Sequence, residues 1–226
     1  MRPEPAANED MREMARLLGT SPALAREALG SALPRIIGSR SSMEEAEALA
    51  RVLTARGRES IAWDRERPLV QLFEAERLVL EGGQFMLEQR SRGRRFIPAR
   101  DIQRIVDLRL RSQTQLFDGG KSFVKEPQQA PGRAVLFVPE PGRGEPGFLS
   151  AQSVDTGNAG MPALAAGQLL QEAVNKARAL VKERVMEVRT TSAVLGLEAA
   201  DGDLLSRALQ LLARLPPTPG SGAGSG

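Results

Sequence analysis

The sequence predicts a mixed α+β protein. We expect a small α/β sandwich, followed by an antiparallel, β-rich, barrel-like domain with a long C-terminal amphipathic helix. Apolar residues recur at helical spacing in several segments before residue 57, then alternate with polar residues in short pieces between 77 and 154. Helical spacing returns over residues 163–188. At 226 residues, the chain has room for one or two domains with apolar cores.

The N-terminal part begins with a polar segment. We assign residues 1–14 to a flexible arm because the first ten residues are polar and contain two prolines, although helical spacing begins at Met11. Ser21 followed by Pro22 is a typical helix start, and Gly30 is a suitable end. A short strand is expected at 35–37.

The segment SSMEEAEALARVLTARG, residues 41–57, predicts a helix with defined ends. Ser42 is a typical N-cap, and Glu45 three residues later completes a capping box. Gly57 is placed to end the helix in the left-handed conformation. The stretch ESIAWD, residues 59–64, predicts a strand, so the order from residue 21 onward is helix, strand, helix, strand.

The spacing of this segment resembles a known family. From a proline, the pattern continues through a serine, an Ala-Glu-Ala-Leu run, a leucine and a glycine, at Pro34, Ser42, 46–49, Leu53 and Gly57. It is similar to the C-terminal domain of the bacterial ribosomal stalk protein and to the related Clp-protease adaptor fold. The resemblance implies a small α/β module over 15–64 that binds proteins. The family's first strand and its factor-binding lysines are not visible, so binding of translation factors is not implied.

The chain after residue 68 changes to strand periodicity. Gly82-Gly83 and the SRG at 91–93 are hairpin turn signals, and a loop is expected over 118–132. Strands are expected at 133–140 and 147–154, followed by the longest helix at 163–188. This order, over 68–190, resembles pleckstrin-homology-type domains, in which a helix closes one end of a barrel. The helix could equally pack on a second copy of the chain.

The remaining residues predict one more helix and a tail. A C-terminal helix is expected over 199–215, and the Gly-, Pro- and Ser-rich residues 216–226 are expected to be flexible. No apolar run approaches the roughly 20 residues of a membrane-spanning helix, and the first residues lack a signal-peptide core. We therefore expect a cytoplasmic protein.

The composition excludes several classes of catalytic site. The chain contains no cysteine, histidine or tyrosine. Thiolate chemistry, His-ligated metals and a Ser-His-Asp triad are therefore excluded, which leaves carboxylate pairs, a Ser-Lys dyad or carboxylate-bound magnesium. The pI is 9.9 at a net charge of +3, and 27 of the 31 basic residues are arginine. This arginine bias is typical of a high-GC bacterial genome, with nucleic-acid binding as the alternative.

Arginines gather around the second hairpin turn, in the sequence QRSRGRR. Guanidinium groups bind carboxylates and phosphates through paired hydrogen bonds, so these residues are the candidate partner- or anion-binding site. The hairpin position also matches the phosphoinositide-binding hairpin of pleckstrin-homology-type domains. A solvated hairpin is the plain alternative. The predicted site consists of Arg90, Arg92, Arg94 and Arg95, and Arg109 and Arg111 could extend it.

These observations predict a non-catalytic bacterial adaptor or assembly protein. We expect no catalytic residues, no metal and no cofactor. The expected partner is another protein that offers an acidic surface or an apolar helix groove, with a second copy of the chain as an alternative. Binding of nucleic acid or anionic lipid through the hairpin is the second hypothesis, and the low aromatic content disfavours nucleic acid. A carboxylate and magnesium enzyme is the third.

Overall fold

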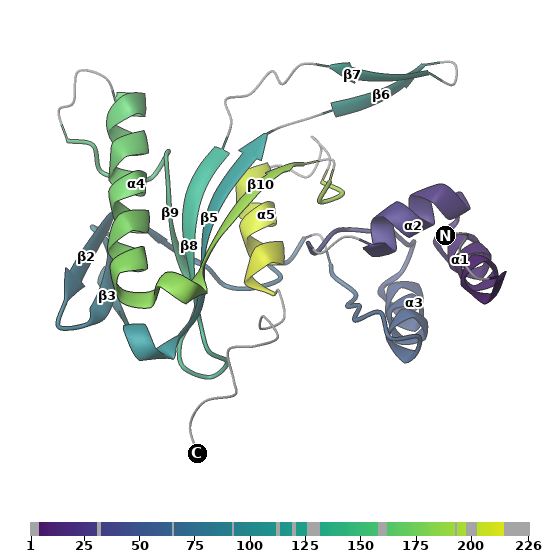
Figure 1. Ribbon diagram of the computed structural model, residues 1–226, viewed down its shortest axis with the longest axis horizontal. Coiled ribbons are helices and arrows are strands. Elements are labelled where there is room, and N and C mark those ends of the chain that lie inside the picture. The colour runs from purple at the N-terminus through teal and green to yellow at the C-terminus, as the bar shows by residue number, and fades with distance from the viewer. Residues whose placement is uncertain are drawn as a thin grey trace. The chain divides into compact units, whose positions relative to one another are not determined.

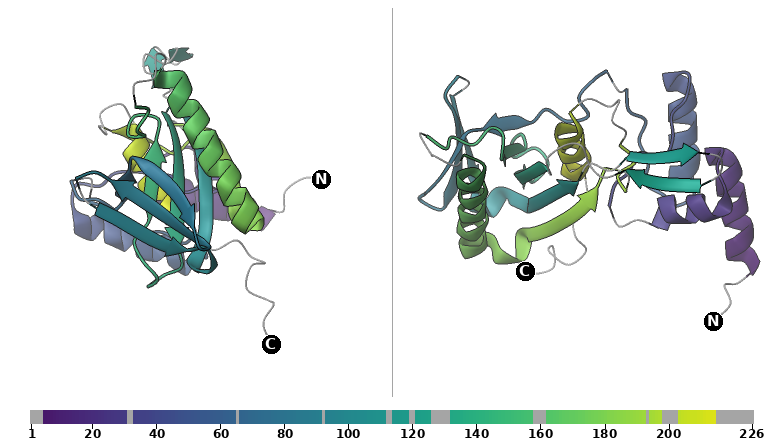
Figure 2. Two further views of the ribbon diagram at one scale, coloured as in Figure 1. Left: turned by 90° about the vertical axis from the view of Figure 1, so that its left-hand side faces the viewer. Right: turned by 90° about the horizontal axis from the view of Figure 1, so that it is seen from above.

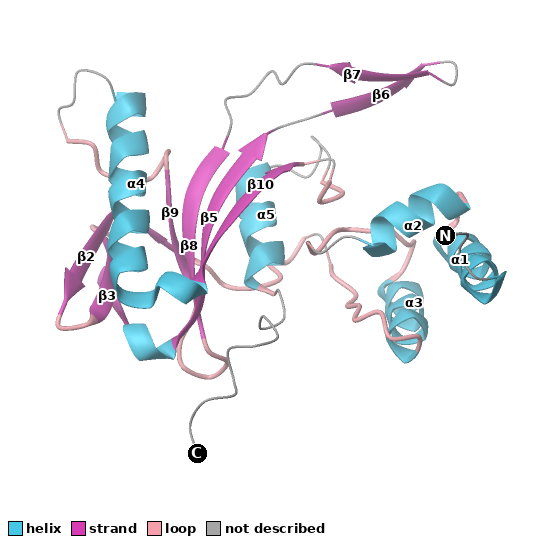
Figure 3. Ribbon diagram, viewed as in Figure 1, coloured by secondary structure: helices cyan, strands magenta, loops and turns pink. Residues whose placement is uncertain are grey.

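The computed structural model divides the chain into two compact units, Met1–Leu69 and Val70–Gly226. The residues described are 5–30, 33–64, 66–91, 93–111, 114–118, 121–125, 132–157, 162–192, 194–197 and 203–214. Helices and sheets are both present, so the chain has a mixed α+β structure (Figure 3).

The described part of the first unit is built from three helices. They are α1 (Pro5–Leu18), α2 (Pro22–Gly30) and α3 (Met43–Ala55). Their apolar faces meet in a small core that contains Met14, Leu18, Ala25 and Leu53. The starts at Pro22 and Ser42 and the end at Gly30 are as predicted from the sequence.

The caps of α3 follow the prediction with one change. The Ser42 hydroxyl accepts a hydrogen bond from the Glu45 backbone N–H at 3.2 Å. The Glu45 carboxylate does not complete the capping box; it accepts a hydrogen bond from the Ser41 hydroxyl at 2.7 Å. At the other end, Gly57 has φ +76°, and the N–H of Arg58 donates to the Leu53 carbonyl at 2.9 Å, as in a Schellman motif.

Three predictions for the first unit are wrong. Residues 5–14, assigned to the flexible arm, lie in α1, because Met11 and Met14 belong to an apolar face that packs on the other helices. Neither 35–37 nor the described 59–64 forms a strand. A strand needs a partner for its backbone groups, and the described residues of this unit offer none. Ile37 packs against the helical core instead.

The second unit contains a five-stranded sheet in the order β1-β9-β8-β5-β10. The β1–β9 and β5–β10 pairs are parallel, and the two central pairs are antiparallel. A separate antiparallel meander consists of β2, β3 and β4. The strands are β1 (Phe73–Ala75), β2 (Arg77–Glu81), β3 (Gln84–Gln89), β4 (Gly93–Pro98), β5 (Ile102–Arg111), β8 (Gly132–Pro139), β9 (Gly147–Ser150) and β10 (Val185–Thr191).

Two helices cover opposite faces of the five-stranded sheet (Figures 1 and 2). Helix α4 (Pro162–Val181) shares a core with the meander and with one face of β5 and β8. Helix α5 (Leu204–Ala213) packs on the other face, where a Cβ added at Gly132 would lie 3.2 Å from Leu205. The Asp203 carboxylate caps α5 by accepting from two backbone N–H groups.

The barrel-like prediction is not met by the described strands. Strands β1 and β10 are the two edges of an open sheet and do not pair with each other. Part of the loop expected over 118–132 is β7 (Lys121–Lys125), which pairs with β6 (Thr114–Asp118). Strand β9 ends at Ser150, earlier than expected, because Ser150 and Ser153 form a hydrogen-bonded turn.

The long helix is also shorter than predicted. It ends at Val181, and Lys182–Arg184 form a single 3-10 turn before β10 begins at Val185. The β-branched residues of β10 are more favourable in a strand, and β5 supplies a parallel partner for all seven positions. The helix expected over 199–215 is α5 among the described residues. The predicted tail at 216–226 lies outside them.

Candidate functional site

The predicted arginine site lies on the hairpin of β3 and β4. The two strands pair antiparallel up to Gln89 and Gly93, so Arg90 lies in the turn and Arg94 and Arg95 lie on β4. Arg92 lies outside the described residues. Gly93 has φ +89°, which allows the chain to reverse at this point. The hairpin therefore forms where the sequence predicts it.

Each described arginine of this hairpin is paired with a carboxylate of the same unit. Arg90 Nη2 lies 2.6 Å from Asp155 Oδ2, Arg94 Nε lies 2.8 Å from Glu88 Oε1, and Arg95 Nη2 lies 2.5 Å from Glu145 Oε2. Arg95 also lies over the ring of Phe73, with 5.3 Å between guanidinium carbon and ring centroid. An external anion would have to displace these carboxylates.

The Asp155 carboxylate is held in its charged form. The backbone N–H of Gly157 donates to Asp155 Oδ1 at 3.0 Å and is the main cause of a lowered pKa, with Arg90 and Arg77 contributing. Because Asp155 is ionised at neutral pH, Arg90 keeps its partner there. The charge of the predicted site is thus partly neutralised within the protein.

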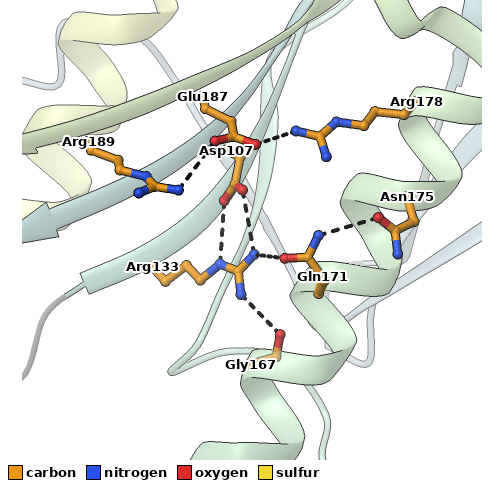
Figure 4. A network of polar contacts seen from close by, with 8 residues as sticks. All are labelled: Asp107, Arg133, Gly167, Gln171, Asn175, Arg178, Glu187 and Arg189. Atoms are coloured by element: carbon orange, nitrogen blue, oxygen red, sulfur yellow. Dashed lines mark hydrogen bonds and ion pairs between the residues drawn. The ribbon is translucent and has the colours of Figure 1, made fainter.

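A second charged site lies between α4 and the sheet (Figure 4). The Asp107 side chain on β5 is only 2% exposed and lies beside Arg133 of β8, with 3.4 Å from Arg133 Nε to Asp107 Oδ1. Arg133 also donates to the Gly167 carbonyl at 3.1 Å and to Gln171 Oε1 at 2.8 Å. The pair therefore joins two strands and α4.

The network continues along α4 and onto β10. Gln171 Nε2 donates to Asn175 Oδ1 at 3.3 Å. Glu187 of β10 accepts a hydrogen bond from Arg178 of α4, and Arg189 Nη2 lies 3.6 Å from its other oxygen. The hydrogen bond from Arg178 is the main cause of a lowered pKa of Glu187, and the charges of Arg178, Arg189 and Arg109 add to it.

Three arginines stand in register across the same sheet face. Arg189 of β10 pairs with Arg109 of β5, and Arg109 pairs with Arg133 of β8. We call these three residues the arginine row. Arg133 is mostly buried, whereas Arg109 is exposed and the Arg189 side chain is 69% exposed. Arg109 lies on β5 of the five-stranded sheet, whereas the predicted hairpin site lies on β3 and β4 of the separate meander.

Sequence reasoning missed the role of Asp107 and Arg133. One signal was present: Asp107 stands within the apolar run IVDLRL at a position where a strand would be buried. A buried carboxylate requires a cationic or hydrogen-bonding partner. The sequence cannot indicate which of its 27 arginines provides it, since Arg133 lies 26 residues away.

The first unit has a shallow, mainly apolar groove along α3. Its walls come from α3 and from the segment at 60–62, and the lining residues are Met43, Glu47, Ala50, Arg51, Thr54, Ala55, Ser60, Ile61 and Ala62. Met43 is 44% exposed and Ile61 57% exposed, large values for apolar side chains. We call these nine residues the α3 groove.

Neither metal ligands nor known relatives assign a chemistry to these sites. Within the residues that the structure describes, no group of three or more acidic side chains could hold a metal ion. Among the same residues, no helix is both long and apolar enough to cross a membrane. No family model, no curated protein and no solved structure matches the chain. The resemblance to the stalk-protein domain stays a prediction of the sequence.

Proposed function

We propose that the chain is a non-catalytic bacterial adaptor or assembly protein of the cytoplasm that binds another protein through the α3 groove. The observation that carries this proposal is the exposure of Met43 and Ile61 in one apolar depression. Removing apolar surface from water contributes about 25 cal/mol per Å², before the costs of association are subtracted. An exposed apolar groove bordered by polar residues is typical of protein–protein contact surfaces.

The charges around the groove indicate the chemistry of the partner. Glu44 and Glu45 are exposed in the first turn of α3, and Glu47 lines the groove beside Arg51, with 3.8 Å between the two side chains. The start of α3 thus carries more negative than positive charge. An amphipathic partner segment with apolar side chains next to a lysine or arginine complements this surface.

The hairpin arginines are a second proposed element of the interface. Arg90, Arg94 and Arg95 already have carboxylate partners within the second unit. Exchanging one carboxylate partner for another yields little net free energy. We therefore assign the main part of the binding to the α3 groove.

The test is quantitative affinity purification with the full chain as bait in lysate of a high-GC bacterium. Met43→Asp and Ile61→Asp place charges in the groove, and Leu24→Asp is the matched control, because Leu24 is 54% exposed on α2 and does not line the groove. We expect wild type and the Leu24 variant to capture the same protein in similar amounts. The groove variants should capture at least about tenfold less of it.

The captured protein is then purified and its affinity measured by calorimetry against the same variants. Equal affinity for wild type and the groove variants would refute the groove as the docking site. If the only captured protein is the chain itself, sedimentation should show an oligomer that the groove variants dissociate. That result would replace the adaptor function with self-association.

A further inference from the structure

Strand β10 has a free edge in the described part of the sheet. It is the last strand in the order β1-β9-β8-β5-β10, and it pairs on one side with β5 over seven residues. No described strand pairs with its other side. A free edge presents unpaired backbone N–H and C=O groups, to which an extended segment can add as a further strand.

The arginine row ends at this edge and carries unbalanced charge. Like charges directly opposite on neighbouring strands are unfavourable, so Arg133, Arg109 and Arg189 need anionic partners. Arg133 has Asp107, and Glu187 is shared by Arg178 and Arg189. Among the described residues, no carboxylate forms an ion pair with Arg109. Four arginines thus face two carboxylates, an excess of two positive charges.

We propose that the edge of β10 binds an extended, acidic segment of a partner protein as a sixth strand. A strand added there continues the row of side chains, with its Cβ about 5 Å from that of the residue opposite. A Glu or Asp opposite Arg189 reaches the free donors of Arg189. It also lies about 10 Å from the Arg109 backbone, within range of that long side chain.

The surrounding charges make this edge selective. Glu187 lies two residues before Arg189 on the same face, so it repels an acidic side chain placed opposite it. The best segment therefore has an acidic residue opposite Arg189 and a neutral or basic residue opposite Glu187. Replacing Glu187 by glutamine should remove this restriction and strengthen the binding of a uniformly acidic strand.

An acidic peptide fits this surface better than a nucleic acid. Proteins that bind single strands usually stack bases on aromatic side chains, and β5 and β10 contain no aromatic residue. The edge instead supplies a row of backbone hydrogen-bonding groups, which a peptide strand matches and a nucleic acid does not. The second unit also carries the entire charge excess, since it contains 20 basic and 17 acidic residues against 11 and 11 in the first.

This inference is independent of the α3 groove, because it uses residues of the second unit only. The probe is a fluorescein-labelled peptide of five Thr-Glu repeats, titrated with the full chain and followed by fluorescence anisotropy at low salt. We expect the Arg109→Gln, Arg189→Gln double variant to bind at least about tenfold more weakly. Glu187→Gln should bind several-fold more tightly. Arg143→Gln, in an exposed turn, is the matched control and should bind like wild type.

Two further arms separate strand addition from simple charge attraction. The same peptide with an N-methyl group at every residue keeps its charge but has no backbone donor on either edge, so it should not bind. A ten-nucleotide single strand of DNA should compete poorly with the peptide. Undiminished binding of the methylated peptide, or of the double glutamine variant, would overturn the proposal, and so would stronger binding of the DNA.

If the glutamine variant does not fold, Arg109→Lys and Arg189→Lys keep the charge and should bind with intermediate affinity.

Discussion

The Asp107 carboxylate accepts hydrogen bonds from Arg133 at 3.4 and 3.5 Å, and this buried pair joins β5 to β8 beneath α4. The distances are long for a charge-assisted hydrogen bond. The Asp107 side chain is nevertheless almost fully buried. Among the described residues, the ion pairs of this site give it one cationic partner, Arg133. Removing one member leaves the other without its counter-charge in a region with little water.

We expect Arg133→Met to lower the free energy of unfolding by about 2–4 kcal/mol, because it leaves the buried Asp107 charge uncompensated. Asp107→Asn should cost less, since Arg133 is 19% exposed and keeps its bonds to Gly167 and Gln171. Urea unfolding of both variants measures the difference. The double variant Asp107→Leu, Arg133→Met should recover most of the loss, and equal effects of all three would contradict this account.

Gly57 ends α3 in the left-handed region, with φ +76°, and no atom lies within 4 Å of a Cβ built there. Gly57→Ala should therefore destabilise the first unit by about 1 kcal/mol through backbone strain alone. Gly30→Ala is the matched control, because Gly30 also has open space but no positive φ. Its substitution in the last position of α2 should be neutral or slightly stabilising. Thermal unfolding followed by circular dichroism checks both.

Gly147 of β9 lies where a side chain has no room. A Cβ there would lie 2.4 Å from Leu87 Cδ1 and 3.2 Å from the Phe73 carbonyl oxygen. Gly147→Ala should cost about 1–3 kcal/mol, because Leu87 is fully buried and must move within the core. In contrast, Gly167→Ala in α4 meets no atom within 4 Å and should stabilise by about 1 kcal/mol. A melting temperature that is unchanged by Gly147→Ala would show that the core yields at Leu87.

The pair of Glu187 and Arg178 should make stability depend on acid pH. The pKa of Glu187 in the folded protein is lowered from its ordinary 4.5, mainly by the hydrogen bond from Arg178. A lowered pKa means that this stabilisation is present above pH 4.5 and is lost as the pH falls through the folded-state value. Urea midpoints measured from pH 6 to pH 3 should fall less steeply for Glu187→Gln than for wild type. Glu183→Gln, an exposed residue of the neighbouring turn, should follow wild type.

The sequence predicted local features well where the cause is local. The starts of α2 and α3 depend on Ser21 and Ser42, and the hairpin of β2 and β3 turns at Gly82-Gly83, which have positive φ. Each of these signals acts through backbone groups within a few residues. The same holds for the hairpin of the predicted arginine site.

Predictions failed where the outcome depends on distant residues. Residues 35–37 have strand propensity, but the described residues of the first unit offer no strand to pair with them, and Ile37 packs against the helical core. Residues 185–188 continue a helical stripe in the sequence, yet β5 offers a parallel partner and the segment becomes β10. The candidate sites follow the same division: the hairpin position was predictable, whereas its pairing with Glu145 and Asp155 was not.

The sequence by itself determined the mixed α+β class, the starts of α2 and α3 and the absence of cysteine and histidine chemistry, because these depend on composition and on neighbouring residues. Only the tertiary structure decided which charges meet. Hydrogen bonding between strands places Arg133, Arg109 and Arg189 in one row, although they are separated by up to 80 residues in the chain. The alternation along each strand fixes which side chains share a face, but which strands become neighbours depends on the packing of the whole sheet.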